Sequence, residues 1–272
     1  MILLKIGCCI SALSLFFAGL AIAANTEIIE CPIIADTLFS GHFNEHDMNN
    51  GALQALVGKA ILGIPVFRFD MSKLKHHKIE GGIFSVYAIR ISAKHVEQQD
   101  LATSRKVSTI AHDWIEGKGI NAFPPESREW ATFDWPGRAI GPTWGKTDND
   151  GKEKNGVSIN VLDVINGQGG SIENEDGRWK FFPKTWTDIE LDAELVQGLV
   201  DDTQYGIAIW TTHDDIGIEF AAKEPARHNP PKEGNPKEGK HAAKLVVESG
   251  GFLAVDAHGK LASMWGELKS MK

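Results

Sequence analysis

The stretch Ile64-Pro65-Val66-Phe67-Arg68-Phe69-Asp70-Met71 decides the fold class. Phe67, Phe69 and Met71 alternate with Val66, Arg68 and Asp70 along it. A side-chain period of two is typical of a β-strand, with the aromatic rings on one face and Arg68 and Asp70 on the other. We therefore expect a strand whose aromatic face packs in a core and whose other face carries a cation and an acid.

Other short segments bounded by turn residues have the same character. Strands are expected at 33–39, 53–57, 83–92, 107–114, 157–161, 178–182, 187–191, 205–210, 216–220 and 244–248. One short helix is expected after Asp192, where Leu195, Val196 and Leu199 share a face. Since the crossover helices of a parallel sheet are missing, the pattern predicts an all-β, antiparallel sandwich or barrel with one short helix and long loops.

The first 23 residues have the features of a secretory signal peptide. A basic start ending at Lys5 precedes an apolar run from Ile6 to Leu20, and the small residues of Ala21-Ile22-Ala23 close it. Cleavage before Ala24 is expected, with a retained anchor as the alternative. We therefore predict a secreted protein, extracellular or periplasmic, with one domain over 24–249 and a C-terminal appendage over 250–272.

Composition and charge exclude some classes of protein. The 272 residues include 28 Lys and Arg against 36 Asp and Glu, a net charge of −8, which becomes −9 once Lys5 is removed with the signal peptide. An acidic chain does not neutralise phosphates, so a nucleic-acid partner is not expected. No apolar run of ~18 residues follows the N-terminus, so no membrane span is expected after cleavage. Cys31 is the sole cysteine of the mature chain and either bridges two chains or is half-buried before the first strand.

The segment from Lys223 to Lys244 stands apart in composition. It contains six Lys and Arg residues, including Arg227, three glutamates and four prolines. Such a segment is either solvated surface or a cationic loop that faces an anionic ligand.

Motifs of catalysis and metal binding were also considered. His42-Phe43-Asn44-Glu45-His46 fits the H-x-x-E-H pattern of zinc peptidases, which requires a helix. Its flanks, Gly41 and Asn49-Asn50-Gly51, favour a loop. Asp148-Asn149-Asp150-Gly151 is a turn or a non-specific calcium site, because the acids of an EF-hand are missing at Lys146 and Val157. Nucleophile elbows and nucleotide-binding glycine motifs are absent from the sequence, and we assign no catalytic residue.

The eight tryptophans are many for this length. Aromatic rings stack on the C–H faces of sugars, so an exposed Trp beside polar loops suits a carbohydrate ligand. Trp135 and Trp144 fall in expected loops and are the ligand candidates, with core packing as the alternative. Tyr87 and Tyr205 fall in strand patterns and are interpreted as packing residues.

Several of these motifs, in this order, resemble DNRLRE domains, a jelly-roll family that includes alginate-binding carbohydrate-binding modules. The resemblance extends from about Ile33 to Glu248. It is carried by Ala35-Asp36-Thr37, Asn49-Asn50-Gly51, the 53–58 segment, the 66–72 strand, Gly82 with Phe84 and Val86, Asp113-Trp114-Ile115-Glu116-Gly117, Val196-Gln197, Tyr205-Gly206-Ile207 and Lys223-Glu224. Ile64 departs from the pattern, since the family usually has Arg six residues before the strand Asp.

The resemblance implies a jelly-roll β-sandwich that binds polysaccharide without cleaving it. It also implies a structural calcium, for which Asp36 and Asp70 are the candidate ligands. Lys223 and Glu224 stand near the family's closing Arg–Glu pair.

The resulting hypothesis is a secreted, non-catalytic protein that binds an acidic polysaccharide. Arg68, Lys223 and Arg227 would pair with sugar carboxylates or hydroxyls, and Trp135 or Trp144 would stack on a ring. Two alternatives stay open. One is a polysaccharide lyase or hydrolase on the same scaffold, and the other is a structural cell-surface or matrix module.

Overall fold

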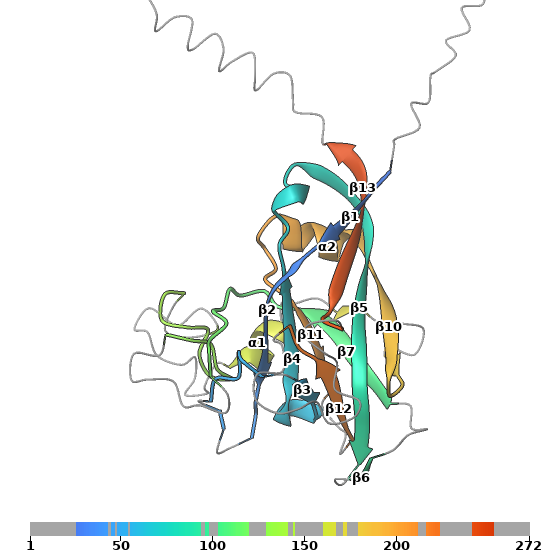
Figure 1. Cartoon of the computed structure of the whole chain (residues 1–272). Helices are drawn as coiled ribbons and strands as arrows, with labels where there is room; N and C mark the ends of the chain where they lie inside the picture. The colour runs from blue at the N-terminus through green and yellow to red at the C-terminus, as the bar shows by residue number, and fades with distance from the viewer. Residues whose placement is uncertain are drawn as a thin grey trace, which may run out of the picture.

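The residues that the structure describes fold as two antiparallel sheets with two short α-helices (Figure 1). The computed structural model describes residues 26–42, 45–46, 48–53, 55–93, 96–97, 103–119, 129–140, 144, 160–166, 171–172, 179–211, 216–223 and 241–252. The expected β-sandwich is therefore present. The expected signal peptide, the 148–151 turn and residues 253–272 of the appendage lie outside the described residues.

The seven-stranded sheet, called sheet A, is built around the long strand β5 (His77–Ala93). On one edge of β5 lie β13 (Lys244–Phe252) and β12 (Ile216–Ala221), and on the other lie β10 (Thr185–Leu191) and β6 (Val96–Glu97). Next to β13 is β1 (Glu27–Cys31), and next to β12 is β3 (Ala55–Gly58).

The six-stranded sheet, called sheet B, contains the stretch that indicated the fold. Its order is β2 (Ile33–Phe39), β4 (Ile64–Phe69), β11 (Ile207–Trp210), β7 (Thr103–Thr109) and β8 (Ser171–Ile172), and β9 (Trp179–Phe181) also pairs with β7. Two 3-10 helices, η1 (Ala60–Leu62) and η2 (Ser72–Leu74), flank β4.

The main core fills the space between the sheets, as the alternation in β4 predicts. The ring of Phe84 from β5 lies 5.5 Å from that of Phe67 and 6.0 Å from that of Phe69, measured between centroids. All three side chains are buried. The aromatic face of β4 thus meets sheet A.

A second core covers the opposite face of sheet B. Val66, Ala208 and Trp210 point away from sheet A and pack with buried residues of a layer that we call the loop layer. This layer consists of residues 110–119, 129–140, Trp144 and α1 (Val161–Asn166), and Figure 1 shows much of it beside β2 and β4, on the side away from β5. The sandwich therefore has three layers, and the outer face of sheet B is not an open surface.

The helix expected after Asp192 is present as α2 (Ala193–Val200). Val196 and Leu199 are buried in the main core and Leu195 packs against it, as the shared face predicts. Asp192 occupies the N-cap position, but its side chain makes no capping hydrogen bond.

Five local features differ from the expectations. Strand β1 was not expected, and β5 begins at His77, before the expected start at residue 83. Residues 110–114 form no strand, because they turn away into the loop layer. Val161 begins α1 rather than ending a strand, so the structure has a second helix. The last strand extends to Phe252, beyond the expected domain boundary at 249.

Within the described part of the chain, no helix is both long and apolar enough to cross a membrane.

Cys31 lies deeper than expected. It ends β1 and packs in the main core with 2% of its surface exposed, rather than being half-buried before the first strand. Burial, helped by the nearby Asp70 carboxylate, raises the pKa of its thiol to about 11. Since the thiolate is the reactive form, the native residue is protected by both its protonation and its position.

We therefore expect Cys31 in the native protein to resist Ellman's reagent at about pH 8, where roughly one thiol in a thousand is ionised. In denaturant the same thiol should react completely within minutes, which the absorbance of the released thiolate measures. Rapid stoichiometric reaction without denaturant, or a disulfide-linked dimer on a non-reducing gel, would contradict this placement.

Candidate functional site

Arg68 occupies the outer face of sheet B at the rim of the loop layer. Its Nη2 donates to Asp113 Oδ1 at 2.5 Å, and its Nε donates to the Tyr205 carbonyl at 3.1 Å. The guanidinium carbon lies 4.5 Å from the centroid of the Trp114 ring. About 23% of the Arg68 side chain is exposed, so it is accessible, but a carboxylate already neutralises it. Arg68 is therefore not a bare cation for a sugar carboxylate.

Lys223 is neutralised in the same way, at the end of β12. Its Nζ lies 3.3 Å from Glu116 Oε2, and its backbone N–H donates to Asp36 Oδ2. The other Glu116 oxygen accepts the N–H of Asp36 at 2.6 Å. This network ties β2, the 113–117 segment and the end of β12 together, which is a structural role. Glu224 and Arg227 lie outside the described residues.

Asp36 and Asp70, the expected metal ligands, do not share a site. Asp36 is buried in β2, opposite Phe67. The backbone N–H of Asp70 instead donates to the carbonyl of Pro32, four residues before Asp36. Four residues of extended chain span on the order of 13 Å. Hydrogen bonds from Ser72 lower the pKa of Asp70. Among the residues that the structure describes, no group of three or more His, Cys, Asp or Glu side chains could hold a metal ion.

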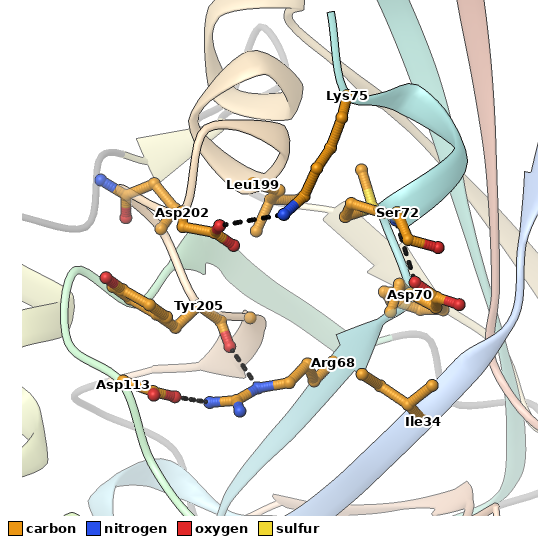
Figure 2. A pocket seen from close by; sticks show the side chains of 13 residues that line it. Ile34, Arg68, Asp70, Ser72, Lys75, Asp113, Leu199, Asp202 and Tyr205 are labelled. Carbon is orange, nitrogen blue, oxygen red and sulfur yellow. Dashed lines mark hydrogen bonds and ion pairs between the residues drawn. The ribbon is translucent and has the colours of Figure 1, made fainter. Parts of the chain in front are cut away.

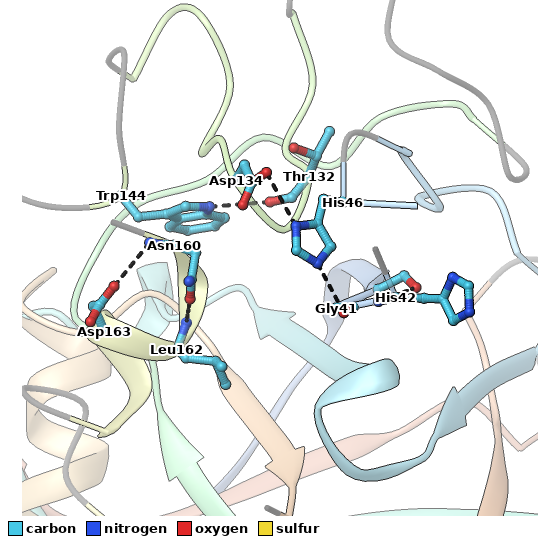
Figure 3. Close-up of polar contacts among 10 residues, drawn as sticks. Gly41, His42, His46, Thr132, Asp134, Trp144, Asn160, Leu162 and Asp163 are labelled. Carbon is cyan, nitrogen blue, oxygen red and sulfur yellow. Dashed lines mark hydrogen bonds and ion pairs between the residues drawn. The ribbon is translucent and has the colours of Figure 1, made fainter. Parts of the chain in front are cut away.

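The prediction that Trp144 presents its ring to a ligand is wrong. Trp144 is fully buried in the loop layer, where its Nε1 donates to the Thr132 carbonyl at 3.1 Å and its ring packs on Phe39 (Figure 3). Trp135 is partly exposed in the same layer, but it is not among the residues that line the pocket beside Arg68. The two loop tryptophans and the two described cations therefore do not form one binding groove.

The described residues of the H-x-x-E-H segment, His42, Glu45 and His46, lie in a bend and a turn rather than in a helix. His46 Nε2 contacts the Gly41 carbonyl at 2.9 Å, and its Nδ1 lies 3.5 Å from Asp134 Oδ2. The His42 ring points away from this pair (Figure 3). The two histidines thus lack the common direction that a zinc site on one helical face requires.

The exposed aromatic residues gather instead on the outer face of sheet A. Trp186 of β10 lies opposite Tyr87 of β5, and their ring centroids are 5.6 Å apart. The His241 ring stacks on Tyr87 at 4.2 Å and 13°, and Lys244 Nζ lies 5.3 Å from the centroid of the Trp186 ring. We call these four residues the aromatic shelf. Trp186 is 36% exposed, so part of this indole is available to a ligand.

Polar groups border the aromatic shelf. Ser85 Oγ donates to Asp188 Oδ1 at 2.6 Å, next to Lys244 in the strand register. Lys244 is exposed, and no described carboxylate lies within 4 Å of its Nζ. His241 and Lys244 are also the described end of the basic 223–244 segment. An exposed ring, an ammonium group and a fixed carboxylate thus converge on one open sheet face.

The sequence contained a signal for the aromatic shelf that our interpretation missed. Side chains two residues apart lie on the same face of a strand, so Trp186 shares its face with Asp188 and Glu190. In the same way Tyr87 shares its face with Ser85, and Phe84 and Val86 lie on the opposite face. An aromatic residue on the polar face of a strand is more informative than one in a loop. The interpretation of Tyr87 as a packing residue is confirmed, although its ring packs on Trp186 and His241 at the outer face of sheet A.

No family model matches the sequence, and no curated protein matches it. The resemblance to DNRLRE domains thus stays a prediction.

Proposed function

We propose that this protein is a secreted, non-catalytic polysaccharide-binding module whose binding surface is the aromatic shelf. In this proposal the sandwich is of the jelly-roll type and related to DNRLRE domains. The observation that carries it is the exposed Trp186 indole with the Lys244 ammonium above its ring on an open sheet face. A flat face of this kind suits a long polymer, which needs no enclosed pocket.

The proposed ligand is an acidic polysaccharide. A uronate ring that stacks on Trp186 can turn its carboxylate toward Lys244, while Asp188 accepts hydrogen bonds from hydroxyl groups. The basic segment that ends beside the shelf carries an excess of three positive charges, six against three, which supports the same charge preference.

Affinity electrophoresis through gels that contain alginate, polygalacturonate or a neutral glucan tests the proposal. The mature protein should be retarded by an acidic polymer, and Trp186→Ala should weaken the affinity by about tenfold, the effect of one well-placed contact residue. Lys244→Ala should weaken it most at low salt, because charge pairing at the surface is screened by ions.

Matched controls are available on the same sheets. Phe182→Ala removes another exposed aromatic side chain, and Lys180→Ala removes another exposed lysine, and both should bind like the wild type. Retention that survives Trp186→Ala and Lys244→Ala together would contradict the assignment of the shelf. Release of unsaturated or reducing ends would instead indicate a lyase or hydrolase, and self-association without retention would indicate a structural module.

A further inference from the structure

A separate pocket lies beside Arg68, away from the aromatic shelf. It has a volume of about 370 Å³, within the range of small-ligand sites. The end of β4, the η2 turn, Ile34 of β2 and the 199–206 segment after α2 surround it (Figure 2). We infer that this pocket is a second binding site, and that its ligand is a single neutral sugar residue.

The recognition group is the Arg68–Asp113 pair, which is fixed before any ligand arrives. Asp113 Oδ1 accepts from both Arg68 Nη2 and the Trp114 N–H, at 2.5 and 2.7 Å. Arg68 Nε is bound to the Tyr205 carbonyl, and its guanidinium rests on the Trp114 ring. Such preorganisation lowers the entropy cost of binding.

The pair still has unused hydrogen-bonding atoms. Within the described part of the chain, Asp113 Oδ2 and Arg68 Nη1 have no hydrogen-bond partner. They offer one acceptor and one donor, one on each member of the pair. A hydroxyl group both donates and accepts, so adjacent hydroxyls of a sugar match this pair better than a carboxylate or an amine does.

The charge of the pocket selects against anions. Asp70, Asp113 and Asp202 line it together with two cations, Arg68 and Lys75, so the formal balance is −1. Hydrogen bonds from Ser72 lower the pKa of Asp70, so its carboxylate stays ionised even in mildly acidic solution. A uronate would therefore meet repulsion here, in contrast to the aromatic shelf.

The walls and the entrance also suit a sugar ring. Ile34, which is 50% exposed, and Leu199 both line the pocket, so apolar side chains are available to the C–H face of a ring (Figure 2). The Lys75–Asp202 ion pair crosses the pocket at 3.9 Å with both side chains more than half exposed. Exposed pairs of this kind are weak, so this one can open to admit a ligand.

Ligand-observed NMR on the mature protein tests the inference with three matched pairs of free sugars: glucose and glucuronate, galactose and galacturonate, mannose and mannuronate. At least one neutral hexose should bind with a millimolar dissociation constant that salt does not change, and its uronate should bind more weakly. Ile34→Trp, which fills the entrance, and Asp113→Asn should each weaken this binding by about tenfold or more.

Two controls separate the pocket from the shelf and from misfolding. Ile28→Trp places the same ring at another exposed isoleucine, 66% exposed on β1, and should bind like the wild type. Trp186→Ala should lose retention by the polymer but keep hexose binding. Absence of binding by all three hexoses, tighter binding of the uronates, or binding unchanged in Ile34→Trp would overturn the inference. None of these results would affect the polymer test of the shelf.

Discussion

Replacing Trp144 by alanine is expected to destabilise the protein by about 3–5 kcal/mol, the usual cost of truncating a large buried aromatic side chain. Trp144 is fully buried, and its ring meets Phe39 edge-on with 5.1 Å between centroids. The truncation would open a cavity between sheet B and the loop layer, and it would leave the Thr132 carbonyl without its partner. Both losses act on the second core.

Urea unfolding followed by circular dichroism measures this effect. The matched control is Trp186→Ala on the aromatic shelf, which should lower the free energy of unfolding by much less, about 1 kcal/mol, because its ring is partly exposed. Trp144→Ala should thus mainly lower stability, whereas Trp186→Ala should mainly weaken polysaccharide binding. A Trp144→Ala variant as stable as the wild type, with lost polysaccharide binding, would restore Trp144 as a ligand residue.

Asn49→Ala is expected to cost about 3 kcal/mol or more, because buried hydrogen-bonding groups left without partners cost roughly 1–3 kcal/mol each. Asn49 is fully buried. Its Nδ2 donates to the Ala131 carbonyl at 2.7 Å, and its Oδ1 accepts the N–H groups of Gly119 at 2.9 Å and Gly51 at 3.3 Å. One amide thus joins three segments of chain at the edge of the loop layer.

A double-mutant cycle that combines Asn49→Ala with Gly117→Ala tests whether these two residues are in contact. A Cβ atom at Gly117 would lie 2.2 Å from Asn49 Oδ1, so Gly117→Ala should be strongly destabilising in the wild type. In the Asn49→Ala background that oxygen is gone, and the same substitution should cost much less, since residues in contact are not additive. Equal costs in both backgrounds, measured by urea unfolding, would show that the two residues do not meet.

Much of the fold could be predicted because strands leave a local signature. The alternation in 64–71 correctly placed Phe67 and Phe69 in the core, and the apolar face after Asp192 correctly predicted α2. The loop layer could not be predicted in this way. Residues such as Phe133 and Trp144 lie in segments without periodicity, and only the three-dimensional arrangement buries them against sheet B.

The candidate site was harder to predict, because charge in a sequence says nothing about pairing. Arg68 and Lys223 were expected to face a ligand as cations, yet Asp113 and Glu116 neutralise them. Both acids come from one five-residue segment, Asp113 to Gly117, distant in sequence from the cations that they meet. No spacing rule predicts such contacts. The aromatic shelf, in contrast, followed from period two and was within reach of the sequence.

The two sheets differ in how many of their positions tolerate substitution without loss of stability. Strand β11, Ile207-Ala208-Ile209-Trp210, is buried at every position because the main core covers one face and the loop layer covers the other. A polar residue at any of these positions would be shut away from water. The outward positions of β10 and β13 carry no such constraint. Sheet A is therefore where this scaffold can exchange side chains at little cost to folding, and where the proposed polysaccharide preference could change.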